Sequence, residues 1–489
     1  MNSPAADGNP PPGGRRAALL FMSLAAFMSS LDASILNLAL PSAQTELTFS
    51  DTDRQWVFTI NLVAVGLVLL GGRLTDYFGR RTIFLIGIVG LTIASTMAGA
   101  ANGFGLFLAA RAVSGLATAA IIPAAISTIV VLFTDGKERG KAFGVYGAVV
   151  GSAGVAALLL GGLVAQVSWR LCFLLNVPLG IVAIIGTVLS VPRDRPGRHH
   201  RFDVLGIVLS TLGLVALSYG FTQAVQSGWT ATLVMLLLGS AVMLIGGFVW
   251  RQARAVDPLL PLRIVRDRMR AGTFAVLFLN SAGMLGLYLF ASYHMQVVLG
   301  FSPMVAALGL LPATAASQAG AFLAGRFQHR YTPRTLLVPA LMSSATAMIW
   351  LTQLSVDGSY LWQVLPSELL LGAGVSCVYV TGINTATSAV DPADAGITSA
   401  MTTTAGNVGG SLGTAVLSTA AAAATGTYLA ASSPTSAQRA EGLVAGFSTA
   451  AGWAAALFLV AAVVAAVAIT TPIPRRPQPS TPAIEGEHR

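Results

Sequence analysis

The stretch Gly71-Gly72-Arg73-Leu74-Thr75-Asp76-Tyr77-Phe78-Gly79-Arg80-Arg81 lies between two long apolar runs, residues 56–70 and 82–98. Its glycines and charges predict a tight loop that joins two neighbouring helices. A weaker copy follows at Gly325-Arg326-Phe327-Gln328-His329-Arg330-Tyr331-Thr332-Pro333-Arg334. A loop that recurs between apolar runs indicates that a whole bundle of helices is repeated along the chain.

The composition indicates a membrane protein with many spans. Of the 489 residues, 54% are hydrophobic and 10% are charged, whereas a soluble domain carries about 25% charged residues. Apolar runs of about 20 residues, each long enough to cross the hydrocarbon core, recur throughout the chain. We predict fourteen spans, and the fold class is therefore an all-α polytopic membrane protein.

The basic residues predict the orientation of these spans. If the N-terminus is cytoplasmic, 24 of the 28 Lys and Arg residues fall in cytoplasmic segments. Arg54, Arg170 and Arg439 fall outside, and Arg111 lies within a span. This asymmetry follows the positive-inside rule, so both termini are expected on the cytoplasmic side of a cell membrane. The net charge of +9 then reflects topology and contact with membrane lipid, and we expect no nucleic-acid partner.

The two loop copies also predict how the chain is organised. One copy follows the second span and the other follows the tenth, whereas a repeat of six-span bundles would separate them by six spans. Two spans are therefore inserted, and a hairpin turning at Ser227-Gly228-Trp229 is the candidate. The predicted order is a disordered cytoplasmic N-terminus (1–16), a six-helix bundle (17–192), two inserted central helices (203–250), a cytoplasmic linker (251–270), a second six-helix bundle (271–471) and a cytoplasmic tail (472–489).

Three ionisable residues, Asp32, Arg111 and Glu368, fall within predicted spans. Each costs roughly 2.5–3.5 kcal/mol at a helix centre, which usually signals function or a pairing partner. Each lies about 10 Å below the outer end of its span at 1.5 Å per residue, so we expect them in one layer around a central cavity. In the functional interpretation Asp32 carries a proton or meets a cationic substrate. In the alternative, the charges form a static ion pair, or Glu368 reaches the interface.

Further polar residues within the spans are candidates for substrate contact. We predict substrate binding by Asp32, Asn37, Asn280, Glu368 and Asn384. Asparagines in spans can equally bridge helices, and Asn407 is open to the same two interpretations. His294 could relay protons, although an interfacial side chain is the commoner explanation, and Gln296 lies beside it.

Small residues and cysteines have structural interpretations. Glycines spaced four apart allow helices to approach closely, and they are taken first as packing sites. Cys172 and Cys377 lie far apart in apolar spans and are expected to be free thiols. No residues have metal-ligand spacing, and no phosphate-binding lysine loop is present. The predicted packing sites are Gly147, Gly151, Gly154, Gly409 and Gly413.

Several motifs together resemble the major facilitator superfamily, and within it the fourteen-span drug:proton antiporter branch. The resemblance covers nearly the whole chain and implies the major facilitator fold, with two six-helix bundles and two inserted helices. The segments that carry it are residues 71–81, Leu31-Asp32-Ala33-Ser34-Ile35-Leu36-Asn37-Leu38-Ala39-Leu40-Pro41, Arg111-Ala112-Val113-Ser114-Gly115 continuing to Pro123, Asn176-Val177-Pro178-Leu179-Gly180 and Gly409-Gly410-Ser411-Leu412-Gly413.

This resemblance implies a monomeric secondary transporter that exports small amphiphilic compounds, such as drugs or antibiotics, by alternating access. The energy source would be the proton gradient, with Asp32, Arg111 and Glu368 in proton coupling and no cofactor. The many Ala, Gly and Arg residues fit a bacterial source. The resemblance also implies that Asp76 faces the start of a helix near residue 395. A cytoplasmic gate would then comprise Gly72, Arg73, Asp76, Gly79, Arg80 and Arg81.

One motif departs from the family pattern and keeps another direction of transport open. In the antiporters a Gly-Pro pair precedes Gly161-Gly162, whereas this chain has Ala157-Leu158-Leu159-Leu160. Proton-coupled uptake of a small metabolite is therefore an alternative. A non-transporting sensor or an embedded enzyme is a remote alternative. The sequence shows no sizeable soluble domain, which argues against a sensor. It shows no catalytic constellation, so the chain is not expected to be an enzyme.

Overall fold

The computed structural model describes residues 12–469, apart from 50, 158–159, 161–163, 165–166, 193–202, 256–257, 302, 357, 389, 392–393 and 430–435. Within these residues every regular element is a helix, which confirms the all-α fold class. Some predictions fall on residues that the structure does not describe. They concern the disorder of residues 1–11, the tail 472–489, the segment 193–202 and the pair Gly161-Gly162.

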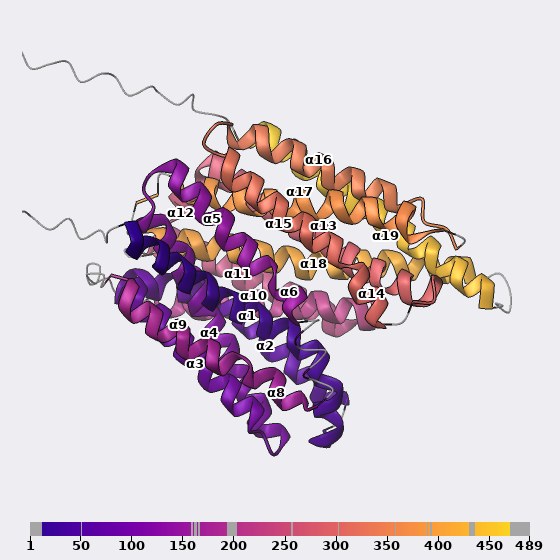
Figure 1. The fold of residues 1–489 in the computed structure, drawn as a ribbon, viewed down its shortest axis with the longest axis horizontal. Coiled ribbons are helices and arrows are strands. Elements are labelled where there is room, and N and C mark those ends of the chain that lie inside the picture. Colours follow the sequence, from indigo (N-terminus) through magenta and orange to yellow (C-terminus); the bar gives the residue numbers. More distant parts are fainter. Residues whose placement is uncertain are drawn as a thin grey trace, which may run out of the picture.

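The long helices fall into two sets that are joined by a hairpin. Figure 1 shows one set in indigo to magenta and the other in orange to yellow, and the two diverge toward one end. The first set comprises α1 (Pro12–Glu46), α2 (Asp51–Phe78), α3 (Arg80–Gly99), α4 (Phe104–Leu132), α5 (Gly136–Gly151), α6 (Ala153–Ala156), α8 (Trp169–Leu174) and α9 (Asn176–Ser190). The hairpin is α10 (Val204–Ser227) and α11 (Thr232–Arg254). The second set comprises α13 (Arg268–Tyr293), η2 (His294–Val298), α14 (Pro303–Gly309), α15 (Leu311–Phe327), α16 (Pro333–Leu351), η3 (Tyr360–Val364), α17 (Leu365–Ala386), α18 (Ala395–Leu429) and α19 (Ser436–Ala468), preceded by the short α12 (Leu262–Arg266).

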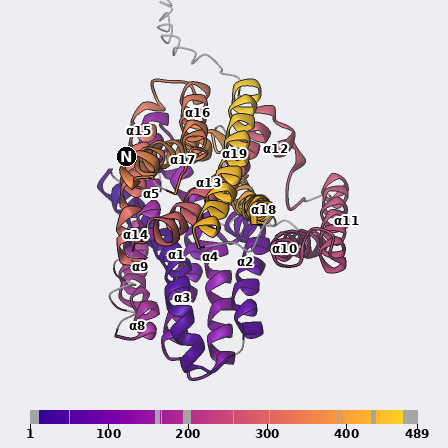
Figure 2. The ribbon, with the colours of Figure 1, turned by 90° about the vertical axis from the view of Figure 1, so that its right-hand side faces the viewer.

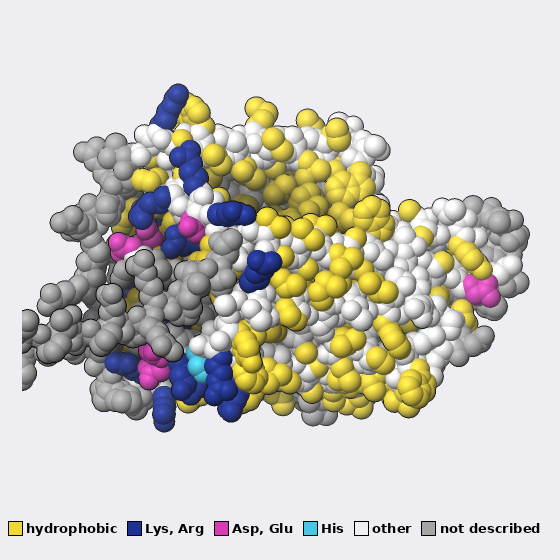
Figure 3. Space-filling model, turned by 90° about the horizontal axis from the view of Figure 1, so that it is seen from above, with side chains coloured by type: hydrophobic (Ala, Val, Ile, Leu, Met, Phe, Trp, Pro, Cys, Tyr) yellow, Lys and Arg dark blue, Asp and Glu magenta, His cyan; other side chains and the backbone are white. Residues whose placement is uncertain are grey.

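The two ends of the molecule differ in charge. Lys and Arg side chains gather at one end (Figure 3), and α1 begins and α19 ends there (Figure 1). We call this the basic end and the opposite end the far end. Ten of the described helices are long and apolar enough to cross a membrane. The count of fourteen spans and the division into six, two and six helices stay predictions.

The hairpin lies at one side of the two sets. Helix α10 packs against α11, α2 and α18, and in Figure 2 α11 is the outermost of these helices. Glycines on α10 make the pairing with α11 close, because a Cβ at Gly213 would stand 2.9 Å from Ile245 and one at Gly220 would stand 2.8 Å from Leu238. Helix α10 is therefore the part of the hairpin that both sets contact.

Two predicted helix boundaries differ from the structure, at the end of α2 and at the start of α1. The segment 71–81 is not a loop, because α2 continues to Phe78 and only Gly79 separates it from α3. Gly79 has φ 89°, a conformation that glycine adopts without steric cost. Similarly, α1 begins at Pro12, so residues 12–16 are helical rather than disordered. A proline is well tolerated in the first turn of a helix, where its missing N–H has no helical partner.

Candidate functional site

The first cluster is a buried ion pair between α1 and α4. Arg111 Nη1 donates to Asp32 Oδ2 at 2.8 Å, and Ser114 Oγ donates to the same oxygen at 2.5 Å. The guanidinium also lies over the ring of Phe173 on α8, 4.7 Å from its centroid. Because Asp32 is 3% exposed and Arg111 4%, the charges are satisfied inside the first helix set. Positive charge over an aromatic face adds to this stabilisation.

Glu368 lies apart from this pair, in the second set. Its Oε2 is 3.3 Å from the hydroxyl of Tyr360, and that hydroxyl is 2.7 Å from the carbonyl oxygen of Gly309. The side chain is fully buried, and its other oxygen has no hydrogen-bond partner among the described residues. The structure thus brings Asp32 and Arg111 together, whereas Glu368, expected in the same layer around a central cavity, has its own partner in the second set.

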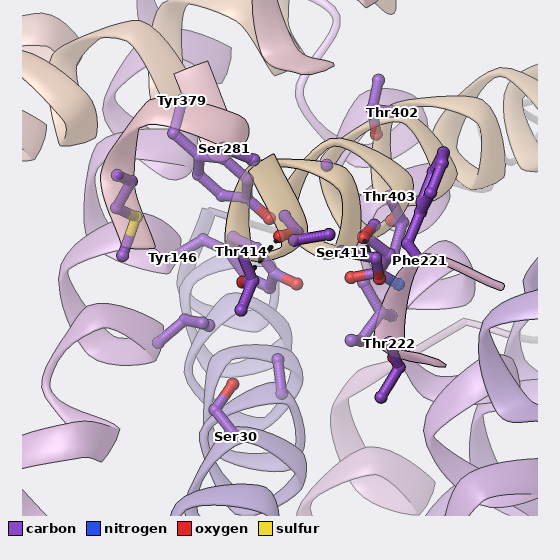
Figure 4. Close-up of a pocket in the computed structure, with 18 of the residues that line it drawn as sticks. Ser30, Tyr146, Phe221, Thr222, Ser281, Tyr379, Thr402, Thr403, Ser411 and Thr414 are labelled. Carbon is purple, nitrogen blue, oxygen red and sulfur yellow. Dashed lines mark hydrogen bonds between the residues drawn. The ribbon is translucent and has the colours of Figure 1, made fainter. Parts of the chain in front are cut away.

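A cavity of about 710 Å³ lies between the two sets. The described residues that line it are uncharged, and neither Asp32, Arg111 nor Glu368 is among them. Figure 4 shows Tyr146 and Tyr379 on one side of the cavity and Phe221 and Thr222 on the other. The lining polar residues are Ser30, Tyr146, Thr222, Ser281, Tyr379, Thr402, Thr403, Asn407, Ser411 and Thr414. Among the described residues, no three His, Cys, Asp or Glu side chains are grouped as metal ligands.

Helix α18 supplies half of these polar groups. Thr403, Asn407, Ser411 and Thr414 recur every three or four residues, which places them on one helix face. Three of the hydroxyls donate within α18, to the carbonyl oxygens of Ser399, Asn407 and Gly410 at 3.3, 3.1 and 2.9 Å. A hydroxyl has one hydrogen to donate and two lone pairs. Having donated within the helix, these side chains present acceptors to the cavity.

The predicted substrate residues are only partly found near this cavity. Asn407 lines it, whereas Asn280 is buried one position before the lining residue Ser281, with its Oδ1 lacking a partner among described residues. Asn384 instead lies at the basic end, where its amide bridges two other side chains. Asn37 belongs to α1, but its side chain lies outside the described residues.

The sequence favours an interfacial position for His294, and the structure contradicts this prediction. The side chain is 0% exposed, and neither ring nitrogen has a hydrogen-bond partner among the described residues. It opens η2, directly after α13. Its burial leaves it as an isolated polar group in the second set, and Gln296 lies in the same short helix.

At the basic end, α2 is fastened to the start of α18. Asp76 accepts hydrogen bonds from the backbone N–H groups of Gly396 and Ile397, at 3.0 and 3.3 Å. A carboxylate is favoured at a helix N-terminus, because free N–H groups and the helix dipole meet there. One turn away, a Cβ at Gly72 would stand 2.5 Å from that of Ala400. This contact lies where the resemblance places it, next to residue 395.

The arginines of the same segment have different partners. Arg73 donates to the carbonyl oxygen of Pro258 at 2.8 Å, in the connecting segment Pro258–Arg266. Arg80 donates to Ser127 and Arg81 to the carbonyl oxygen of Val188, both inside the first set. Among the arginines of the predicted gate, only Arg73 therefore leaves the first set in these contacts.

The second copy of the segment makes an equivalent contact with α5. A Cβ at Gly325 would stand 2.9 Å from the carbonyl oxygen of Gly140 and 2.9 Å from the Cα of Gly144. Beside it, Arg139 Nε donates to Asn384 Oδ1 at 2.8 Å, and Asn384 Nδ2 donates to Gln328 at 2.7 Å. Sequence reasoning missed Gly140, Gly144 and Arg139, although the repeat itself pointed to a second contact of this kind.

The predicted packing glycines divide into three kinds. Gly409 and Gly413 fit against the carbonyl oxygens of Phe278 and Ala282, each 2.1 Å from where a Cβ would stand, and they join α18 to α13. Gly147 packs against Val380 of the other set, and Gly151 has looser contact with Gln318. No described atom lies within 4 Å of a Cβ at Gly154, so the structure gives that glycine no packing role.

The cavity begins directly beyond the closed basic end. On α18 the close contact of Ala400 with Gly72 is followed directly by the first lining residue, Thr402. On α5 the contact with Gly325 involves Gly144, and the lining begins at Tyr146. Two helix sets that enclose a largely apolar, uncharged cavity, with contacts closing one end, form the architecture of a membrane carrier.

Comparison with known proteins gives the family. A model described as Major Facilitator Superfamily matches residues 22–414, and the chain belongs to that superfamily. It is 42% identical over 457 residues to the puromycin resistance protein pur8 of Streptomyces alboniger, covering 92% of this chain and 90% of that one. It is 34% identical over 409 residues to the cephamycin export protein CmcT of Amycolatopsis lactamdurans, covering 82% and 84% of the two chains. The crystal structure of the human organic anion transporter MFSD10 shares the fold, with a TM-score of 0.64 at 15% identity over 93% of this chain and 100% of that one.

Proposed function

We propose that this protein exports an antibiotic or a related amphiphilic compound across a bacterial cell membrane in exchange for protons. The observation that carries the proposal is an uncharged cavity between two helix sets, lined by apolar side chains and by hydroxyl groups, in a chain similar over nearly its whole length to a puromycin resistance protein. The basic end faces the cytoplasm by the positive-inside rule. Both helix sets that line the cavity belong to one polypeptide, so in this proposal one chain is a complete transport unit.

In this proposal the basic end is a cytoplasmic gate, and the structure represents its closed state. Asp76 and Gly72 hold α2 against α18, while Gly325, Asn384 and Arg139 hold the second set against α5. The cavity is then reached from outside. When the sets rock apart at the basic end, the cavity becomes accessible to cytoplasmic cargo, as alternating access requires.

Proton coupling is assigned to Asp32 and Arg111. Protonation of Asp32 removes the charge that holds the guanidinium, so it weakens the tie between α1 and α4. Because Asp32 does not line the cavity, cargo and proton do not compete for one carboxylate in this proposal. They are linked through the conformation of the first set, which is an indirect coupling between two separate sites.

Transport in vesicles tests this function. Inside-out membrane vesicles containing the protein are given an acidic lumen, and uptake of labelled puromycin is followed. Vesicles without the protein correct for passive trapping of this basic compound. We expect protein-dependent uptake that stops when an ionophore removes the pH gradient. In whole cells, loss of the protein should raise intracellular puromycin. No pH-driven flux for any compound of a broad antibiotic panel would contradict the proposal, and lower intracellular drug on loss of the protein would indicate uptake instead.

A further inference from the structure

One wall of the cavity comes from the inserted hairpin. Phe221, Thr222 and Val225 of α10 line the cavity together with residues of both helix sets. Helix α10 packs against α2 and α18, one helix from each set, and so lies at the side where these helices meet. Figure 4 shows Phe221 and Thr222 facing the same space as Ser411 and Thr403 of α18.

Helix α10 is fixed at its far end by a tie to the second set. After the turn of the hairpin, Trp229 Nε1 donates to Thr419 Oγ1 of α18 at 3.1 Å. The Trp229 ring also lies against Phe221, with centroids 6.4 Å apart. The lining residue Phe221 is therefore held in place by the same residue that anchors the turn.

At the basic end α10 is fixed by Asp203, the residue before its first turn. Asp203 accepts from the N–H of Gly206 at 3.0 Å, from Gln252 Nε2 at 2.8 Å and from Arg251 Nε at 3.1 Å. Gln252 in turn accepts from the N–H of Leu260 at 3.1 Å, which ties the hairpin to the connecting segment. With both ends fixed, the side chains on the cavity face of α10 keep a defined position.

The hydroxyl of Thr222 on α10, like those on α18, donates its hydrogen within its own helix. Thr222 Oγ1 donates to the carbonyl oxygen of Ser218 at 3.0 Å. Its hydrogen is used within the helix, so its lone pairs are what it offers to the cavity. Phe221 and Val225 beside it add apolar surface. A ligand between α10 and α18 would therefore meet acceptors on both sides and an aromatic ring at one edge.

We propose that α10 belongs to the cargo site, and that Phe221 and Thr222 select aromatic compounds that carry several N–H or O–H donors. The inference rests on the proposed function, since it names the cargo class of the same cavity. It assigns the inserted hairpin a role in recognition, beyond filling space beside the two sets.

Thiol labelling tests the position of α10 independently of any cargo. In a Cys172→Ala/Cys377→Ala background, Thr222→Cys is compared with Leu212→Cys, which lies on the outer surface of the same helix and is 52% exposed. A charged, membrane-impermeant methanethiosulfonate should label Thr222→Cys about tenfold faster or more, because thiolate forms readily in water and poorly among lipid chains. Equal, slow labelling of both would overturn the proposal.

Selectivity tests the recognition itself. Thr222→Val keeps the shape of the side chain but removes its acceptor. For puromycin, which carries N–H and O–H donors, we expect KM to rise about two- to tenfold, as for one lost hydrogen bond. Tetraphenylphosphonium, which has no donor, should inhibit puromycin transport as strongly in Thr222→Val as in the native protein. The control variant Leu212→Ala should change neither the KM for puromycin nor the inhibition by tetraphenylphosphonium.

The outcomes separate this inference from the function on which it rests. If the native protein exports nothing, the proposed function fails, and labelling still decides whether α10 lines the cavity. If the native protein exports puromycin and Thr222→Val leaves its KM unchanged, only the role of α10 in recognition is overturned.

Discussion

At the scale of single residues, the proposed proton coupling rests on the ion pair of Asp32 and Arg111. Both charges are buried, and the carboxylate also accepts from Ser114. Removing one charge of a buried pair leaves the other uncompensated, whereas neutralising both can cost little. This difference separates a functional pair from one that only joins α1 to α4.

We predict that Asp32→Asn abolishes pH-driven export and lowers thermal stability, because Arg111 keeps a buried charge without a counter-ion. The double variant Asp32→Asn/Arg111→Gln should recover most of the stability and none of the coupling. Export in vesicles with and without a pH gradient measures the coupling, and thermal unfolding in detergent measures the stability.

The double variant also exposes the structural alternative. If the pair were only a static link between helices, the neutral hydrogen-bonded pair would restore transport together with stability. Recovery of pH-driven export in Asp32→Asn/Arg111→Gln would therefore remove Asp32 from the coupling mechanism.

Single residues also show what the sequence could predict of the site. An ionisable group within an apolar run is visible in the sequence, and its burial cost marks Asp32 and Arg111 as candidates. Glu368 was found too, but its separation from the pair depends on how the two sets pack. Asn384 and Asn407 look alike in sequence, and only the assembled structure puts one at the basic end and the other in the cavity.

At the scale of helices, two close contacts between helices shut the basic end: α2 crosses α18, and α15 crosses α5. We call them the α2 crossing and the α5 crossing, and their chemistry differs. At one crossing, Asp76 caps the start of α18. At the equivalent position of the second copy stands His329, where partial burial and the charges of Lys137 and Arg330 lower the histidine pKa below its usual value. The bridge from Asn384 to Arg139 supplies the polar contact there instead.

We predict that Asp76→Asn weakens the crossing of α2 and α18. An amide keeps one acceptor but loses the charge favoured at a helix N-terminus, roughly 0.3–1 kcal/mol, so the fraction of open gates should rise about two- to fivefold. Thr75→Cys, placed on the residue that faces Gly396 and is 1% exposed, reports opening through its labelling rate from the cytoplasmic side.

Transport supplies the second readout for Asp76→Asn. The KM for puromycin should stay near that of the native protein, because Asp76 does not line the cavity, while turnover should fall. Unchanged turnover together with unchanged labelling of Thr75→Cys would exclude a gate role for Asp76.

The helix boundaries show why the sequence predicted where α2 meets α18 but not that segment 71–81 is helical. The glycines and charges of 71–81 marked a contact point, and the resemblance marked its partner near residue 395. The pattern could not show that α2 stays helical to Phe78, because polar residues continue a helix as readily as they end one. As a result Gly72, Thr75 and Asp76, spaced i, i+3 and i+4, lie on one face of one helix within about one turn, and they act on α18 together.

At the scale of the whole molecule, the connecting segment joins the hairpin to both sides of one crossing. Its Pro258 accepts from Arg73 of α2, and its Arg263 pairs with Asp394, directly before α18, at 2.5 Å. Leu259, Leu260 and Ile264 are buried in the same apolar cluster as residues of α2 and α18. Opening at this crossing must therefore move the connecting segment as well. The connecting segment is in turn tied, through the hydrogen bond from Leu260 to Gln252, to the hairpin that borders the cavity.

Opening of the two crossings should be one event if each set moves as a rigid body. We predict that Asn384→Ala, which removes the bridge to Arg139 and Gln328 at the α5 crossing, raises labelling of Thr75→Cys at the α2 crossing by about tenfold, because the lost hydrogen bonds include one to a charged group. Labelling rate reports the open fraction when opening and closing are fast. Thr449→Ala, which removes an exposed hydroxyl bonded only within α19, should leave the rate unchanged. If Asn384→Ala altered transport without changing the labelling of Thr75→Cys, the two crossings would open independently, and rigid rocking of the sets would be excluded.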